Sequence, residues 1–168
     1  GNSLGDGITL GEQVHTLLPY MFTESGITSL IIPATVMKIR DYAFSNCNSL
    51  ESIYIPESVT SIGSYAFSSC NSLESITLPD KLTSISSGMF TSCKSLTSIT
   101  LPESITKIGS SAFNGCTALT SIYIPDSVTS IKESAFKGTG LSVVEIGSKV
   151  TEIELAAFTG LESISVSD

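Results

Sequence analysis

The sequence predicts a single solenoid domain, in which short β-strands stack in parallel, coil upon coil. Three residue types predict this fold, because they recur with a common period of 23 residues. A fixed period of about 20–50 residues is typical of repeat architectures, in which each unit buries its apolar face against its neighbours. The recurring residues are proline (Pro33, Pro56, Pro79, Pro102 and Pro125), phenylalanine (Phe44, Phe67, Phe90, Phe113 and Phe136) and cysteine (Cys47, Cys70, Cys93 and Cys116).

The period organises residues 1–168 as one domain, because no linker or change of composition interrupts it. Five regular repeats occupy residues 27–140, and a shortened repeat follows at 141–160. Residues 161–168 are expected to form one terminal strand. Residues 5–26 are expected to form a divergent first repeat, because five apolar residues keep the spacing of the later units: Ile8, Leu10, Val14, Leu17 and Phe22.

Each repeat is expected to contain two strands and one tighter turn. The segment 50–55 alternates apolar and polar residues, which is the pattern of a half-buried strand, and Pro56 then ends it. A second alternating stretch at 59–62 predicts a short strand. The following segment 64–70 predicts a short helical or 3₁₀ turn opened by serine or glycine. The predicted core of this unit, repeated in the others, is Leu50, Ile53, Ile55, Val59, Ile62, Ala66 and Phe67.

The repeat resembles that of the BspA-like leucine-rich repeat family. Residues 96–116 read L-T-S-I-T-L-P-E-S-I-T-K-I-G-S-S-A-F-N-G-C, almost the family pattern, and the resemblance extends over about residues 8–166. It implies a right-handed superhelix with a parallel, concave sheet. It also implies a surface or secreted protein of a host-associated bacterium, of a kind that attaches to host matrix proteins, host cells or other microbes. The chain departs from the pattern at its ends, where Gly11 and Gly147 replace proline and cysteine is missing.

The composition excludes several classes of protein. Hydrophobic residues make up 41% and charged residues only 14% of the chain, and the mean hydropathy of +0.33 raises the question of a membrane span. No apolar run approaches the ~20 residues that a spanning helix needs, so no membrane insertion is expected. The net charge of −8 would repel a polyanion, so no nucleic-acid partner is expected.

The four cysteines are best interpreted as a column of free, buried thiols. Stacking would bring equivalent residues about 5 Å apart, which a disulfide tolerates, but parallel side chains do not give its ~90° dihedral. A thiol filling a small apolar space and donating weakly to a carbonyl is the simpler interpretation. A metal site is not expected, because the chain has no C-x-x-C motif and His15 is its only histidine.

No enzyme activity and no cofactor are expected. A serine nucleophile needs a base and an orienting acid, and His15, the only imidazole, lies in the divergent first repeat. Phosphate-binding and dinucleotide-binding loops are also missing from the sequence.

An acidic rim is expected along one edge of the stack, where an acidic residue follows the proline of four repeats. Such a row could recruit calcium or a basic partner, and the simpler alternative is a solvated edge that keeps the solenoid in solution. Its members are Glu57, Asp80, Glu103 and Asp126.

The outward positions of the first strand in each repeat form the candidate binding surface. Alternation directs Ile53 and Ile55 inward, so Ser52 and Tyr54 point out onto the concave face. Tyrosine could anchor a peptide or stack on a sugar, although tyrosine and threonine also favour strands for their own sake. The candidate partner-binding residues are Ile31, Ser52, Tyr54, Thr77, Thr100, Tyr123 and Glu145.

The sequence therefore favours a non-catalytic binding or adhesion module that recognises a protein ligand through the concave face. The alternatives are a glycan-binding module and a structural spacer that presents other domains. The family resemblance implies a cell-surface or extracellular location, although the chain contains no signal peptide. Exposed strand edges at the ends of a solenoid also allow end-to-end self-association.

Overall fold

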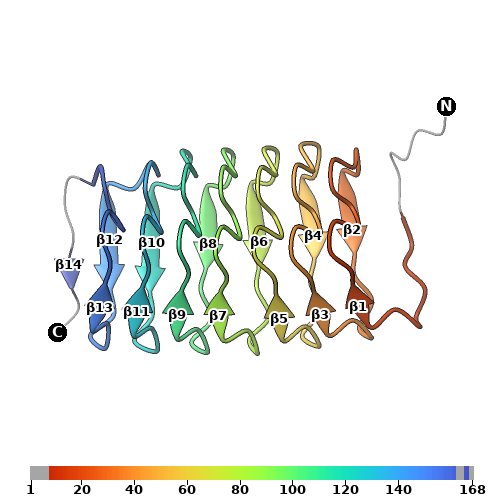
Figure 1. The fold of residues 1–168 in the computed structure, drawn as a ribbon, viewed down its shortest axis with the longest axis horizontal. Coiled ribbons are helices and arrows are strands. Elements are labelled where there is room, and N and C mark those ends of the chain that lie inside the picture. Colours follow the sequence, from red (N-terminus) through yellow and green to blue (C-terminus); the bar gives the residue numbers. More distant parts are fainter. Residues whose placement is uncertain (1–7, 162–164, 167–168) are drawn as a thin grey trace.

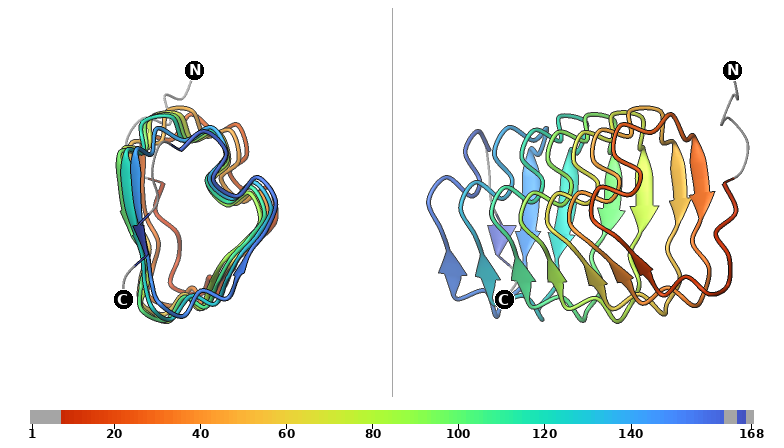
Figure 2. Two further views of the ribbon diagram at one scale, coloured as in Figure 1. Left: turned by 90° about the vertical axis from the view of Figure 1, so that its left-hand side faces the viewer. Right: turned by 45° about the vertical axis from the view of Figure 1, so that its right-hand side comes forward.

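The computed structural model describes residues 8–161 and 165–166, and the chain forms an elongated β-solenoid (Figure 1). Seen along the long axis, the coils superimpose, and the two strands of each coil lie on different sides (Figure 2). The parallel stacking confirms the predicted solenoid class. The long strands are β2 (Ser29–Ile31), β4 (Ser52–Tyr54), β6 (Ser75–Thr77), β8 (Ser98–Thr100), β10 (Ser121–Ile124) and β12 (Val143–Ile146), followed by β14 (Ser165–Val166). The short strands are β1 (Thr16–Leu17), β3 (Lys38–Ile39), β5 (Ser61–Ile62), β7 (Ser84–Ile85), β9 (Lys107–Ile108), β11 (Ser130–Ile131) and β13 (Glu152–Ile153).

The register places equivalent residues of successive repeats side by side. Ser29 pairs with Ser52, and Ile85 pairs with Ile108. The row of long strands nevertheless divides into three hydrogen-bonded groups, namely β2–β4, β6–β8 and β10–β12–β14. Strands β4 and β6, like β8 and β10, lie next to each other but belong to different groups.

The core consists of continuous columns of apolar residues from equivalent positions of successive coils, and in two of these columns every member is the same residue. All seven phenylalanines of the chain stack in one column, with neighbouring ring centroids 5.0–5.8 Å apart and rings within 15° of parallel. In the unit at residues 50–67 the predicted core is buried except at Ile53, which is only partly covered. Equivalent residues of the two end repeats are less well covered, and Ile153 is exposed. Ile53 and its equivalent Ile99 lie on β4 and β8, the strands beside the two divisions of the row, so solvent reaches them there.

The expectation of a helical or 3₁₀ turn at residues 64–70 is wrong. Among the described residues this segment and its equivalents form successive hydrogen-bonded turns, with no helix. The reason lies in the backbone: Tyr65 and Ser69 have φ angles of 56° and 58°, in the left-handed region. The N–H groups of Tyr65, Phe67 and Ser69 donate to carbonyls of the next coil, 2.7–3.0 Å away. Only the intervening N–H groups bond three residues back, so no helical hydrogen-bond series develops.

Candidate binding face

The cysteine column is structural, as the sequence predicts. All four thiols are free and buried, and each donates a hydrogen bond to a phenylalanine carbonyl of the preceding coil, as Cys93 does to Phe67 at 3.0 Å. Burial raises the pKa of Cys47 to about 11 and that of Cys93 to about 12. A neutral, enclosed thiol is a poor nucleophile and a poor metal ligand, so this column offers no reactive site.

His15 lies exposed on the first coil, where its Nδ1 is 3.1 Å from the carbonyl oxygen of Thr35. Within the part of the chain that the structure describes, no three His, Cys, Asp or Glu side chains converge as a metal site would require. In that same part, no helix is both long enough and apolar enough to cross a bilayer.

The four residues of the acidic rim are exposed, but two of them also bind the backbone of the next coil. The Glu57 carboxylate accepts a hydrogen bond from the Asp80 N–H at 2.9 Å. Asp126 accepts bonds from the N–H and the hydroxyl of Ser148, at 2.7 and 3.2 Å. Part of the row therefore stabilises the turns that follow the long strands, a role that the sequence analysis missed.

All seven candidate partner-binding residues lie exposed on the outer side of the row of long strands, here called the long-strand face. Its largest exposed side chains are Ile31, Tyr54 and Tyr123, with 74%, 59% and 48% of their surface accessible. The smaller residues Ser52, Thr77 and Thr100 and the acidic Glu145 occupy the positions beside and between them.

Two depressions on the long-strand face lie where the row of strands divides. The first has a volume of about 480 Å³ and is lined by β2, β4 and Thr77 of β6, including Ile31, Ile53 and Tyr54. The second has a volume of about 300 Å³ and is lined by β8, β10 and β12, including Ile99 and Tyr123. Each depression thus combines a partly covered core isoleucine with an exposed tyrosine.

Acidic side chains gather around the long-strand face. Burial raises the pKa of Tyr123, and the carboxylates of Glu103, Asp126 and Glu145 raise it further. Lys81 and Lys149 follow the acidic rim, in the turns that lead to the short strands. Four of the basic residues lie in or directly after the short strands on the other side of the solenoid, namely Lys38, Arg40, Lys107 and Lys132.

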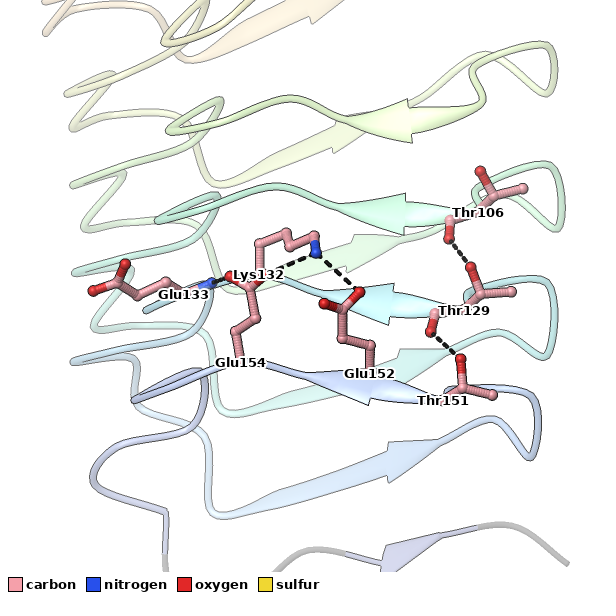
Figure 3. Close-up of polar contacts among 7 residues, drawn as sticks. All are labelled: Thr106, Thr129, Lys132, Glu133, Thr151, Glu152 and Glu154. Atoms are coloured by element: carbon pink, nitrogen blue, oxygen red, sulfur yellow. Dashed lines mark hydrogen bonds and ion pairs between the residues drawn. The ribbon is translucent and has the colours of Figure 1, made fainter.

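Some of the charge on the short-strand side forms ion pairs between coils. Figure 3 shows Lys132 between Glu152 and Glu154 of the next coil, with Nζ–O distances of 2.9 and 2.7 Å. The hydroxyls of Thr129 and Thr151 each donate to the threonine carbonyl of the preceding coil (Figure 3). These contacts join each coil to the next.

A second aromatic column, which was not expected from the sequence, lies in the first coils. The rings of Tyr20, Tyr42 and Tyr65 stack with centroids 5.0 and 5.1 Å apart. The column ends at Gly88, where an added Cβ would clash with Cε1 and Cδ1 of the Tyr65 ring. The spacing of 22 and 23 residues was a signal that could have revealed the column.

Comparison with known proteins gives a consistent result. A family model described as "BspA type Leucine rich repeat region" matches residues 3–51 and 37–165, with six copies. A leucine-rich repeat protein from Eubacterium ventriosum is similar in structure, with a TM-score of 0.84 and 27% sequence identity over 92% of this chain. A leucine-rich repeat protein of T. pallidum gives a TM-score of 0.72 and 28% identity over 91% of the chain.

A leucine-rich cell surface protein from Faecalibacterium prausnitzii gives a TM-score of 0.54 and 28% identity over 88% of the chain. The chain spans 42%, 66% and 53% of the lengths of the E. ventriosum, T. pallidum and F. prausnitzii proteins, respectively. Among curated protein sequences, no significant match is found.

Proposed function

Because the chain belongs to the BspA-type leucine-rich repeat family, we propose that it is a binding module that recognises a protein partner through the long-strand face. Solenoids of this family are typically non-catalytic, and the module is proposed to work by adhesion rather than by catalysis. The seven candidate residues of the long-strand face are proposed to contact the partner, and the acidic rim is proposed to border that contact.

The observation that carries this proposal is the distribution of exposed apolar side chains. In the middle of the stack, over residues 38–152, the exposed large hydrophobic residues are Tyr54, Tyr123 and Val143. All three lie on the long-strand face, and Ile31 extends the set towards the first coil. Among the described residues, those exposed outside this face lie towards the two ends of the stack: Leu18, Tyr20, Met21, Met37, Ile153 and Leu155. Tyrosine is enriched among the residues that dominate binding energy, because its ring supplies apolar area and its hydroxyl a polar contact.

A location at the cell surface or outside the cell is part of the proposal. It is supported by the family and by the F. prausnitzii relative, which is described as a cell surface protein. The partner class that fits such a location is an extracellular protein, such as a component of the host matrix.

The test replaces both tyrosines by threonine, the residue that β6 and β8 carry at the equivalent positions. The Tyr54→Thr/Tyr123→Thr variant should bind a panel of immobilised matrix proteins at least about tenfold more weakly than the wild type in surface plasmon resonance. Met37→Ala is the matched control, because Met37 is a comparably exposed apolar residue outside this face. Unchanged binding by the double variant, or equal loss by the control, would argue against the proposal.

Glycan binding is the second candidate, and one feature favours it. Each tyrosine lies beside small hydroxyl-bearing residues, such as Ser52 and Thr77 near Tyr54. A ring that can stack on a sugar, with hydroxyls beside it that can hydrogen-bond to the same sugar, suits carbohydrate recognition. A glycan array with signals that the same tyrosine variant abolishes would support this alternative over the protein partner.

A further inference from the structure

The first coils carry a feature that the tyrosines alone do not explain: Ile31 stands between two depressions. The depression of about 480 Å³ lies on the β4 side, and another of about 410 Å³ lies on the side of residues 8–12. Both are lined by Ser29, Leu30 and Ile31, so β2 forms a ridge with a hollow on each flank. The Ile31 side chain is 74% exposed, although isoleucine is among the residues that are most often buried.

The lining of these hollows is mainly apolar. Ile8, Leu10 and Pro33 contribute on one flank, and Ile53 and Ile55 on the other. A contiguous apolar surface of this kind is typical of an interaction site. A bulky apolar side chain of a partner would be buried from water on binding in either hollow.

The charged residues that line the hollows all have one sign. The described residues that line the four depressions of the long-strand face include four acidic residues, Glu12, Glu57, Asp80 and Glu145, and no lysine or arginine. The neighbouring carboxylates of Glu103 and Asp126 extend this field along the acidic rim. Such a field attracts a cationic partner and rejects an anionic one, while the apolar contact supplies most of the affinity.

We propose that the ridge at Ile31, with its two hollows, is the primary docking point for an extended, cationic protein segment in which lysine or arginine residues accompany leucine or tyrosine. This proposal rests on the proposed function and specifies its partner. Apolar side chains of the segment enter the hollows beside Ile31 and Tyr54, and its cationic groups lie near Glu12 and Glu57. The hollow at Tyr123 is a secondary contact, about 19 Å from Ile31 at four coil spacings.

The test uses three synthetic peptides as probes with the whole chain: Lys-Leu-Lys-Tyr-Lys-Leu-Lys, its counterpart with glutamate in place of lysine, and its counterpart with serine in place of leucine and tyrosine. Fluorescence anisotropy should detect binding of the first peptide only. Its affinity should fall as salt rises from 50 to 300 mM, because exposed charges are screened. Binding of the glutamate peptide with equal affinity, or no binding of the lysine–leucine peptide, would overturn the proposal.

Two variants locate the docking point. Ile31→Ser should weaken binding of the first peptide about tenfold, whereas Tyr123→Thr, the matched change in the other hollow, should alter it less than about twofold. Glu57→Gln should weaken binding at low salt and have little effect at high salt. Because both altered hydrophobic side chains are exposed, the melting temperature should stay unchanged and so report that the variants are folded.

The outcomes separate this inference from the proposed function. If Tyr123→Thr removes binding and Ile31→Ser does not, the long-strand face binds its partner but the ridge at Ile31 is not the docking point. If neither variant affects binding, and the amide signals that shift in NMR lie outside the long-strand face, both proposals fail.

Discussion

The interior and the long-strand face of the same coils differ in how far a residue is repeated from one coil to the next. The column at positions 44, 67, 90, 113 and 136 is phenylalanine in every coil, and its rings stack throughout. On the long-strand face the equivalent residues of successive coils are Ile31, Tyr54, Thr77, Thr100, Tyr123 and Glu145. An inner side chain must fit the coils on both sides, whereas an outer one meets solvent. Stability is thus a property of the constant columns, and recognition is open to the variable ones.

The strongest challenge to this contrast is a change in the middle of the phenylalanine column. Phe90 is fully buried between the rings of Phe67 and Phe113, so Phe90→Ala should reduce the free energy of unfolding by about 3–5 kcal/mol. Chemical denaturation measures this loss. Phe158→Ala, at the end of the column where the side chain is only partly buried, should cost clearly less. Equal losses would show that packing between two neighbouring rings does not add to the contribution of Phe90.

The cysteine column sharpens the contrast through its dependence on pH. The raised pKa of Cys93, about 12 against an ordinary 9.0, means that the unfolded thiol ionises first. Its contribution to stability is complete below pH 9 and is lost progressively as pH rises towards 12. The difference in unfolding free energy between wild type and Cys93→Ala should therefore shift by about 1 kcal/mol in favour of the variant between pH 7 and pH 10. Denaturation curves at the two pH values that give the same difference would contradict a buried, neutral thiol.

A substitution on the long-strand face should change the free energy of unfolding much less than one in the interior. Tyr54→Thr should change the free energy of unfolding by less than about 0.5 kcal/mol, because the ring is exposed and threonine suits a strand. Differential scanning calorimetry can compare it with Phe90→Ala under the same conditions. A loss close to that of the phenylalanine variant would mean that the tyrosine serves the fold rather than a partner.

The smallest effect is expected on the short-strand side, at the ion pairs of Lys132. Hydrogen bonds to Glu154 and Glu152 raise the pKa of Lys132, and the bond from Lys132 lowers that of Glu154. The pairing stabilises the fold above the ordinary glutamate pKa of 4.5 and below the ordinary lysine value of 10.5. Lys132→Met should therefore lower the melting temperature slightly at pH 7 and not at all at pH 2. A difference that persists at pH 2 would exclude the ion pairs as its source.

The success of the sequence in predicting columns has a simple physical basis. Stacking at a fixed repeat length turns a period along the chain into a neighbour in space, so Phe67 and Phe90, or Cys70 and Cys93, had to lie side by side. The thiols donating to carbonyls were predicted on the same basis, and the bonds are present. The outward positions of Tyr54 and Tyr123 follow from strand alternation.

The errors arise where backbone geometry or long-range pairing decides. A helical turn at residues 64–70 suits local propensity, but left-handed φ angles at Tyr65 and Ser69 direct alternate N–H groups to the next coil. The divisions beside β4 and β8, next to which two of the depressions lie, leave no mark on the 23-residue period of the sequence. The bond from the Asp80 N–H to Glu57 likewise depends on how one side chain reaches across a coil.

Because the repeats stack at a fixed spacing, the number of repeats between two residues sets the distance between them. Tyr54 and Tyr123 are separated by 69 residues, which is three complete repeats. In-frame duplication of one repeat between them would move the tyrosines apart by a single step of about 4.8 Å, and deletion of one would bring them closer by the same step. Because each inner column would gain or lose one apolar member at an equivalent position, the fold should tolerate either change. A lineage carrying this gene could thus match the reach of its two tyrosines to a new partner by unequal recombination, with no substitution at either residue.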